Sequence, residues 1–206
     1  MEISSKEPNL FYLRLEDVSQ LLASCREVGI AVEDLAKLPV KRQREKAAER
    51  LLLCRAFGHP VTLCHDSQGA PLVDGMEVNI SITHTQQLVA LAVDDSQVIG
   101  IDAELADRQQ VIKVRDKFLN DKEKQFIAPD DLAAHIIAWT AKEAVIKAER
   151  NSAIDWTGGI CLEPCIITEP LMQEITLAAR CGDRLYNLIT RRVEGHFITL
   201  AALAEQ

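Results

Sequence analysis

Residues 94–104 have the sequence Asp-Asp-Ser-Gln-Val-Ile-Gly-Ile-Asp-Ala-Glu and lie near the middle of this 206-residue chain. The first four residues favour a turn, and the apolar residues after them predict a β-strand that opens the second half. Asp102 and Glu104 are two residues apart in that strand, so their carboxylates point to the same face. The stretch therefore divides the chain and brings two acidic groups together.

The first half has the pattern of a small α+β unit. A helix is predicted over 18–28 and a stronger one over 41–57, which is rich in helix formers and is followed by Gly58 and Pro60. Short apolar runs bounded by turn formers predict strands at 10–15, 61–64, 71–73, 78–82 and 88–93, forming a small antiparallel sheet.

The second half repeats this order of elements. After the strand at 98–104 we predict helical stretches over 108–118 and 121–127 and a long helix over 131–149. Four further strands are predicted at 160–167, 174–179, 184–190 and 197–203. We therefore expect an α+β fold of two similar lobes, residues 1–97 and 98–206, each a long helix packed on a small antiparallel sheet.

Composition excludes several classes of function. Thirty-one acidic residues against 23 basic ones give a formal net charge of −8, which disfavours general attraction to nucleic acid or to an anionic membrane. No apolar run approaches the roughly 20 residues of a membrane-spanning helix, and the N-terminus lacks a secretory pattern. We expect a cytoplasmic protein that binds an anionic ligand only through a local cluster of cations.

The Asp102 and Glu104 carboxylates have two interpretations. They lie among apolar residues, where negative charge is costly to bury unless a metal or another cation neutralises it. Magnesium typically binds one or two protein carboxylates together with substrate phosphate oxygens. The alternative is an exposed strand edge with ordinary surface charges, and the pair alone leaves both open.

The predicted helix over 131–149 adds a third carboxylate and a cation. Glu143 and Lys147 are four residues apart and share one helix face, with Trp139 one turn earlier. By itself such a pair only supports the helix. If this face packs against the strand of Asp102 and Glu104, three carboxylates and a lysine could hold a divalent ion and a phosphate.

Two segments of the first half could bind an anion. Thr83 and His84 end a predicted strand and could hydrogen-bond a phosphate. The alternative is a histidine that caps local backbone. The segment 41–50 has a local excess of three positive charges. Such clusters are usually solvated helix faces, but the overall negative charge makes an anion pocket equally plausible. The cations of the 41–50 segment are Lys41, Arg42, Arg44, Lys46 and Arg50.

Residues 100–104 and 139–147 together resemble the paired signature of the 4′-phosphopantetheinyl transferases, Gly-(Ile/Val)-Asp-x-Glu followed by Trp-x-x-Lys-Glu-(Ala/Ser)-x-x-Lys. Residues 80–85 resemble the family's upstream Asn-x-Ser-His-(Ser/Thr) segment, and 118–123 its Phe-(Phe/Ser)-x-x-x-Glu stretch. The length is similar to the single-chain, surfactin-synthetase-activator type. The resemblance implies pseudo-twofold lobes with the active site in the cleft between them.

The resemblance also implies a reaction. Members transfer the phosphopantetheine arm of coenzyme A to a serine of an apo acyl or peptidyl carrier protein, releasing adenosine 3′,5′-bisphosphate. This is the activity of a holo-[acyl-carrier-protein] synthase, and it serves lipid, polyketide or nonribosomal peptide biosynthesis. A monomer is expected, since two lobes in one chain could form the site.

The same resemblance assigns roles to residues. Asp102, Glu104 and Glu143 would ligate magnesium, and Lys147 would neutralise phosphate charge. Either Glu143 or a metal-held water would accept the serine proton. The nucleotide end of coenzyme A would be held by Lys41, Arg44, Arg50, Thr83 and His84.

Three positions depart from the family pattern. Ala70 stands where a lysine is usual, Ser81 stands where an asparagine is usual, and no Gly-rich turn follows Lys147. None of these removes a predicted metal ligand, so we expect an active enzyme. Two alternatives remain: a magnesium-dependent phosphodiesterase or nuclease, and a non-catalytic module that binds carrier proteins.

Overall fold

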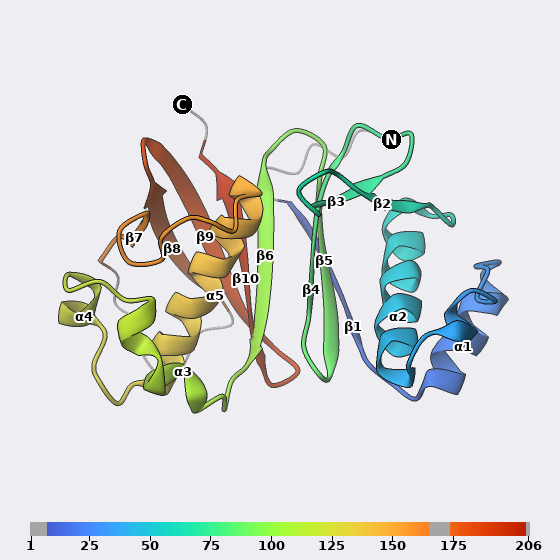
Figure 1. Cartoon of the computed structure of the whole chain (residues 1–206), viewed down its shortest axis with the longest axis horizontal. Coiled ribbons are helices and arrows are strands. Elements are labelled where there is room, and N and C mark those ends of the chain that lie inside the picture. The colour runs from blue at the N-terminus through green and yellow to red at the C-terminus, as the bar shows by residue number, and fades with distance from the viewer. Residues whose placement is uncertain (1–7, 165–173, 205–206) are drawn as a thin grey trace. The chain divides into compact units, whose positions relative to one another are not determined.

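The computed structural model describes residues 8–164 and 174–204 and has two compact units, Met1–Ser96 and Gln97–Gln206. Figure 1 shows helices and sheets in each unit, and every strand pair in the described residues is antiparallel. The predicted α+β class is therefore confirmed. The end of the strand predicted at 160–167 lies outside the described residues.

The first unit contains a three-stranded sheet in the order β1-β5-β4. Its strands are β1 (Asn9–Arg14), β4 (Asn79–His84) and β5 (Leu88–Asp94). The central strand β5 is apolar and buried along almost its whole length, as expected for a strand covered on both faces. Strands β2 (Leu63–His65) and β3 (Pro71–Val73) form a separate two-stranded ribbon, whereas one sheet was predicted for this half.

Helix α2 (Val40–Phe57) is the main helix of this unit. It begins after Pro39 and ends at Gly58, whose φ of 76° is the left-handed conformation that glycine adopts without strain. Its apolar face enters a core that also includes residues of α1 (Val18–Glu27), β4 and β5. A short 3₁₀ helix, η1 (Leu35–Lys37), follows α1.

The second unit contains a five-stranded sheet in the order β6-β10-β9-β8-β7. Its strands are β6 (Ile99–Leu105), β7 (Ile160–Leu162), β8 (Glu174–Cys181), β9 (Arg184–Val193) and β10 (His196–Leu203). The first strand of the unit pairs with the last, so Asp102 lies opposite Thr199. The candidate carboxylates therefore lie on an edge strand whose partner comes from the far end of the chain.

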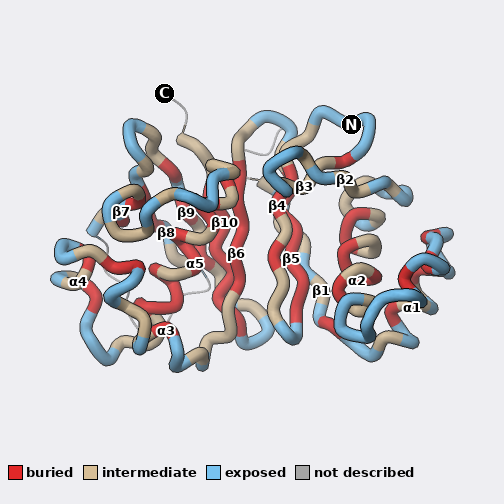
Figure 2. Tube along the Cα trace, in the orientation of Figure 1, coloured by how far each residue is buried: buried red, intermediate tan, exposed pale blue. Residues whose placement is uncertain are grey.

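Helix α5 (Leu132–Glu149) packs on this sheet. Asp131 caps it by accepting a hydrogen bond from the Ala134 amide, and most of its residues are buried. Figure 2 shows buried residues along β6 and β10. Helix α5 supplies much of the core of this unit, together with residues of β10. In the described part of the chain, no helix combines the length and apolarity that crossing a membrane requires.

The segment between β6 and α5 is less helical than predicted. Instead of helices over 108–118 and 121–127, it has two four-residue helices and a 3₁₀ turn. These are α3 (Gln110–Lys113), η2 (Arg115–Lys117) and α4 (Glu123–Phe126). Phe118 and Leu119 insert into the core, and Glu123 turns inward to a buried lysine. These tertiary contacts override the helix propensity of the segment.

Candidate active site

Strand β6 and helix α5 approach each other unusually closely at Gly100. A β-carbon on Gly100 would lie 1.9 Å from the carbonyl oxygen of Ala144 and 2.6 Å from the amide nitrogen of Ala148. Only glycine permits this backbone contact, and alanines four residues apart supply the matching flat surface on the helix. The glycine of the Gly-Ile-Asp-Ala-Glu segment therefore brings the carboxylate strand against the Glu143–Lys147 helix.

Lys147 connects the two elements directly. Its Nζ donates to the Asp102 Oδ1 at 2.8 Å and to the Ile101 carbonyl at 2.9 Å. Asp102 is only 7% exposed, and its charge is compensated by this lysine, whose side chain retains 30% exposure. The strand and helix motifs, predicted separately, thus meet at an ion pair.

The second carboxylate of the strand has a different cation. Glu104 pairs with Arg108, four residues later, and the Arg108 guanidinium lies over the Trp139 ring at 5.6 Å from its centroid. Arginine commonly stacks on a tryptophan in this way. Glu104 is thereby linked through one arginine to helix α5.

Glu143, the third predicted metal ligand, interacts electrostatically with the charged residues around it. Burial raises the pKa of Glu143, and the negative charge of Asp102 raises it further, while Lys147 and Arg108 oppose the shift. Asp102, Glu143, Lys147 and Arg108 therefore act on one another as a single charge cluster. Such a perturbed carboxyl is typical of functional sites, although structural ion pairs produce it as well.

In the first unit, His84 is held by a carboxylate that the pattern had not singled out. His84 Nε2 lies 2.7 Å from Glu49 Oε1, and Lys46 Nζ lies 2.6 Å from Glu49 Oε2. The Glu49 side chain is 3% exposed. Burial raises the pKa of Glu49, but the His84 and Lys46 hydrogen bonds together bring that pKa below its ordinary value. His84 is thus fixed at the end of β4 by an ionised glutamate of α2.

The structure does not bring all of the other predicted nucleotide-binding residues together. Lys41 and Arg44 line a pocket of about 260 Å³ together with Thr85, and Arg44 also donates to the carbonyls of Leu15 and Glu16. Thr83 is buried in β4.

Arg50 lines a second pocket of about 650 Å³. Its guanidinium forms a two-pronged pair with Asp34, at 2.9 and 2.5 Å, which ties α2 to the segment before η1. The basic excess of 41–50 is largely paired with neighbouring carboxylates. These pairs join Lys41 and Arg42 to Glu45, Lys46 to Glu49, and Arg50 to Asp34.

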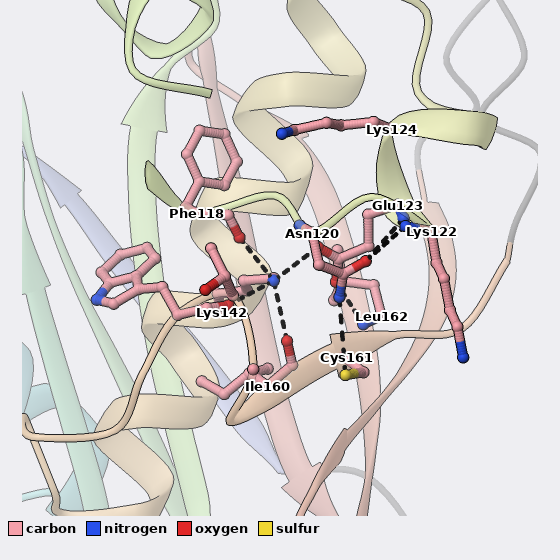
Figure 3. A network of polar contacts seen from close by, with 12 residues as sticks. Phe118, Asn120, Lys122, Glu123, Lys124, Lys142, Ile160, Cys161 and Leu162 are labelled. Carbon is pink, nitrogen blue, oxygen red and sulfur yellow. Dashed lines mark hydrogen bonds and ion pairs between the residues drawn. The ribbon is translucent and has the colours of Figure 1, made fainter. Parts of the chain in front are cut away.

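Lys142, next to Glu143, faces the interior. Its Nζ contacts four acceptors: the carbonyls of Phe118 and Trp156 at 2.7 Å, that of Ile160 at 2.9 Å, and Glu123 Oε2 at 2.8 Å (Figure 3). The Lys142 and Glu123 side chains are 0% and 1% exposed. Burial lowers the pKa of Lys142, and the Glu123 carboxylate opposes that shift. The network ties α5 to the 118–123 segment and to the start of β7.

Residues 98–178, which include this network and the charge cluster, match the family model ACPS, the 4′-phosphopantetheinyl transferase superfamily. The second unit therefore carries a 4′-phosphopantetheinyl transferase superfamily domain. The predicted superfamily is confirmed over residues 98–178, and this superfamily implies a transferase. No curated protein matches the chain.

In this transferase domain the carboxylates do not form a ready-made metal site. Within residues 8–164 and 174–204, no three or more His, Cys, Asp or Glu side chains are grouped closely enough to hold a metal ion. The all-oxygen donor set nevertheless suits magnesium, and the charge of Asp102 acting on Glu143 is a repulsion that a divalent cation would relieve. At present Lys147 and Arg108 supply that compensation.

Sequence reasoning did not assign site roles to three residues that contact predicted ones or their neighbours: Glu49 of the first unit, and Arg108 and Lys142 of the second. Glu49 was not singled out within the 41–50 segment, and Arg108 was placed only at the start of the helical stretch predicted over 108–118. A usable signal for Glu49 was its position four residues before the apolar Leu53 and four after Glu45, on a face that proves buried. Lys142 had a similar signal, since it lies between Ala141 and Ala144 in an apolar helix.

Proposed function

We propose that this protein transfers the phosphopantetheine arm of coenzyme A to a serine hydroxyl of an apo acyl or peptidyl carrier protein. The superfamily match over residues 98–178 carries the proposal. The chemistry of the charge cluster supports it, because phosphoryl-type transfer depends on holding and neutralising negative charge. The second product is adenosine 3′,5′-bisphosphate.

Lys147 and Arg108 are the cations that would bind phosphate oxygens of the coenzyme. Lys147 is partly exposed and already lies beside Asp102, so a small change of its side chain would present the ammonium to a pyrophosphate. Arg108 is also partly exposed and offers several N–H donors to phosphate oxygens. Their present carboxylate partners keep both cations close to the site in the absence of substrate.

Asp102, Glu104 and Glu143 are the proposed magnesium ligands. Magnesium, when bound there, would neutralise the pyrophosphate and stabilise the charge that develops on the departing bisphosphate. The protein's own contribution is to supply oxygen donors from β6 and α5, two elements locked together at Gly100.

Glu143 is the proposed acceptor of the serine proton. Its raised pKa makes it a better proton acceptor than an ordinary carboxylate, which favours general-base catalysis near neutral pH. The alternative acceptor is a water molecule held in the site.

The first unit is proposed to bind the nucleotide end of coenzyme A through Lys41, Arg44, Arg50, Thr83 and His84. Lys41 and Arg44 share one pocket, which supports a joint role in holding a phosphate. Glu49 would orient His84 by binding its Nε2. Arg50 would have to leave Asp34 to reach a ligand, so its contribution is expected to be the smallest of the five.

The proposal is tested by the mass of an apo carrier protein after incubation with the full-length chain, coenzyme A and magnesium. We expect the carrier to gain the mass of one phosphopantetheine arm. Asp102→Asn and Glu143→Gln should lower kcat by at least about 100-fold. Asp121→Asn is the matched control, because the Asp121 side chain is fully exposed and its Oδ1 lies 3.7 Å from Lys124 Nζ.

The carrier assay, together with an incubation of the protein with DNA and magnesium, separates the two alternatives. Cleavage of single-stranded or plasmid DNA with magnesium, without carrier modification, would indicate the phosphodiesterase or nuclease. A carrier that binds the protein yet never gains mass would indicate a non-catalytic module. Unchanged kcat in both carboxylate variants would refute the proposed site while leaving the family assignment intact.

A further inference from the structure

Three aromatic residues of the second unit form one contact group, called here the aromatic cluster: Phe118, Trp139 and Trp156. The Phe118 and Trp139 ring centroids lie 5.3 Å apart in an edge-to-face arrangement, and those of Trp139 and Trp156 lie 4.6 Å apart. Phe118 and Trp156 are 6.4 Å apart, so each ring contacts the other two. The members come from three separate places in the sequence and need a common anchor.

Lys142 is that anchor. Its Nζ binds the backbone carbonyls of Phe118 and Trp156, both at 2.7 Å, and Trp139 lies one turn earlier on the same helix. One buried ammonium therefore fixes the backbones of Phe118 and Trp156 relative to α5, which itself carries Trp139. Glu123, which balances its charge, also accepts hydrogen bonds from the amides of Asn120 and Leu162. The anchor is thus built into the 118–123 segment and β7.

The outer surface of the cluster supports a residue of the charge cluster. Arg108 lies over the Trp139 ring, and the same guanidinium pairs with Glu104. The connection therefore runs from Lys142 through two backbone carbonyls to the rings, and from Trp139 to Arg108 and Glu104. A residue that faces away from the charge cluster is linked to it by direct contacts.

We propose that Lys142 is a positioning residue: by anchoring the aromatic cluster, it holds Arg108 beside Glu104 in the substrate-free site and so places this cation where it can bind phosphate oxygens of the coenzyme. This inference rests on the proposed function. If Lys142 served stability alone, it would form the same ion pair with Glu123, but kcat would not depend on the packing of the rings.

The test uses Lys142→Met combined with Glu123→Gln in the full chain. Removing both charges avoids leaving one buried ion unpaired, which would itself unfold many proteins. The control is Lys122→Met, the same substitution at an exposed lysine of the same segment, whose side chain points away from the network in Figure 3.

The spectroscopic readout is specific because the chain has only two tryptophans, Trp139 and Trp156, and both belong to the cluster. Tryptophan bands in near-ultraviolet circular dichroism therefore report on its packing. Far-ultraviolet dichroism reports on the fold, and steady-state kinetics separates kcat from the carrier KM.

For the double variant we expect unchanged far-ultraviolet dichroism, tryptophan bands reduced to less than about half, kcat reduced at least about tenfold and a carrier KM within about twofold of wild type. The Lys122→Met control should match wild type throughout. Wild-type kcat in the double variant would overturn the proposal. A lower kcat with unchanged tryptophan bands would overturn it too, because the rings would not be the link.

Trp139→Leu tests the same connection from its outer end and leaves the buried ion pair intact, so it applies even if the double variant does not fold. It removes the support of Arg108 and should lower kcat to a similar degree with little change in carrier KM, whereas wild-type kcat would overturn the inference. If the wild-type chain never modifies a carrier, the proposed function fails, and the catalytic role of Lys142 fails with it. If the wild type is active and a variant keeps either its tryptophan bands or its kcat unchanged, this inference is overturned and the proposed function is not.

Discussion

The α-carbon of Gly100 faces the backbone of Ala144 so closely that an added β-carbon would lie 1.9 Å from the Ala144 carbonyl oxygen. Backbone atoms, unlike the end of a flexible side chain, cannot move aside without displacing the helix. The contact between β6 and α5 therefore depends on one missing methyl group. It also determines whether Lys147 can reach Asp102.

Gly100→Ala should lower the free energy of unfolding by about 3 kcal/mol or more, because strand and helix must separate. Gly58→Ala is the control. Gly58 has a positive φ, unlike Gly100, but has open space around it, so that substitution should cost only about 1 kcal/mol. Urea unfolding of both variants measures the difference, and equal losses would show that α5 yields easily at this position.

Glu143→Gln should stabilise the protein at neutral pH when divalent cations are absent. The folded state raises the pKa of Glu143 above 4.5, so the folded state binds the proton more tightly and wild-type stability falls as pH rises through this window. Because glutamine cannot ionise, the stability of the variant does not fall with pH at this position. We expect the Tm advantage of the variant to grow between pH 4 and pH 8, reaching roughly 2 °C.

The comparison needs thermal melts of both proteins at several pH values in a chelating buffer. Asp121→Asn serves as the control, because its fully exposed carboxylate should give the variant no such pH-dependent advantage. A Tm difference that stays constant between pH 4 and pH 8 would contradict the role assigned to the buried carboxyl.

Arg150 ends α5 in the left-handed region, with φ 52° and ψ 31°, at the position where helices commonly have glycine. Arg150→Gly should be more stable than Arg150→Ala by about 1 kcal/mol, because alanine keeps the β-carbon that opposes this conformation. Both variants lose the arginine side chain, so their comparison isolates the backbone effect. Denaturant unfolding provides the measurement, and equal stabilities would count against backbone strain.

Thr199 joins two buried hydroxyls, lying 2.7 Å from Thr140 of α5 and 2.8 Å from Thr190 of β9, measured between Oγ1 atoms. Thr199→Val should lower the free energy of unfolding by about 1–3 kcal/mol, because both partners lose a hydrogen bond in a site without solvent. Thr176→Val, at an exposed position of β8, is the matched control and should change stability by less than about 0.5 kcal/mol. A similar loss in both would point to strand propensity instead.

The sequence by itself determined the α+β class, the two long helices and the superfamily of the second unit, because side-chain periodicity and the spacing of Asp102, Glu104, Glu143 and Lys147 are local properties. Only the tertiary structure decided which cation meets which carboxylate. Lys142 finds its acceptors 14 to 24 residues away, and Glu49 reaches His84 from another element. Burial makes these contacts necessary, since an unpaired charge in the core is costly, but no local pattern states which distant group will pair with it.

Tertiary contacts also explain why 108–127 has only short helices. Phe118 and Glu123 are buried in the core, and their contacts there interrupt the helices that the local sequence favours.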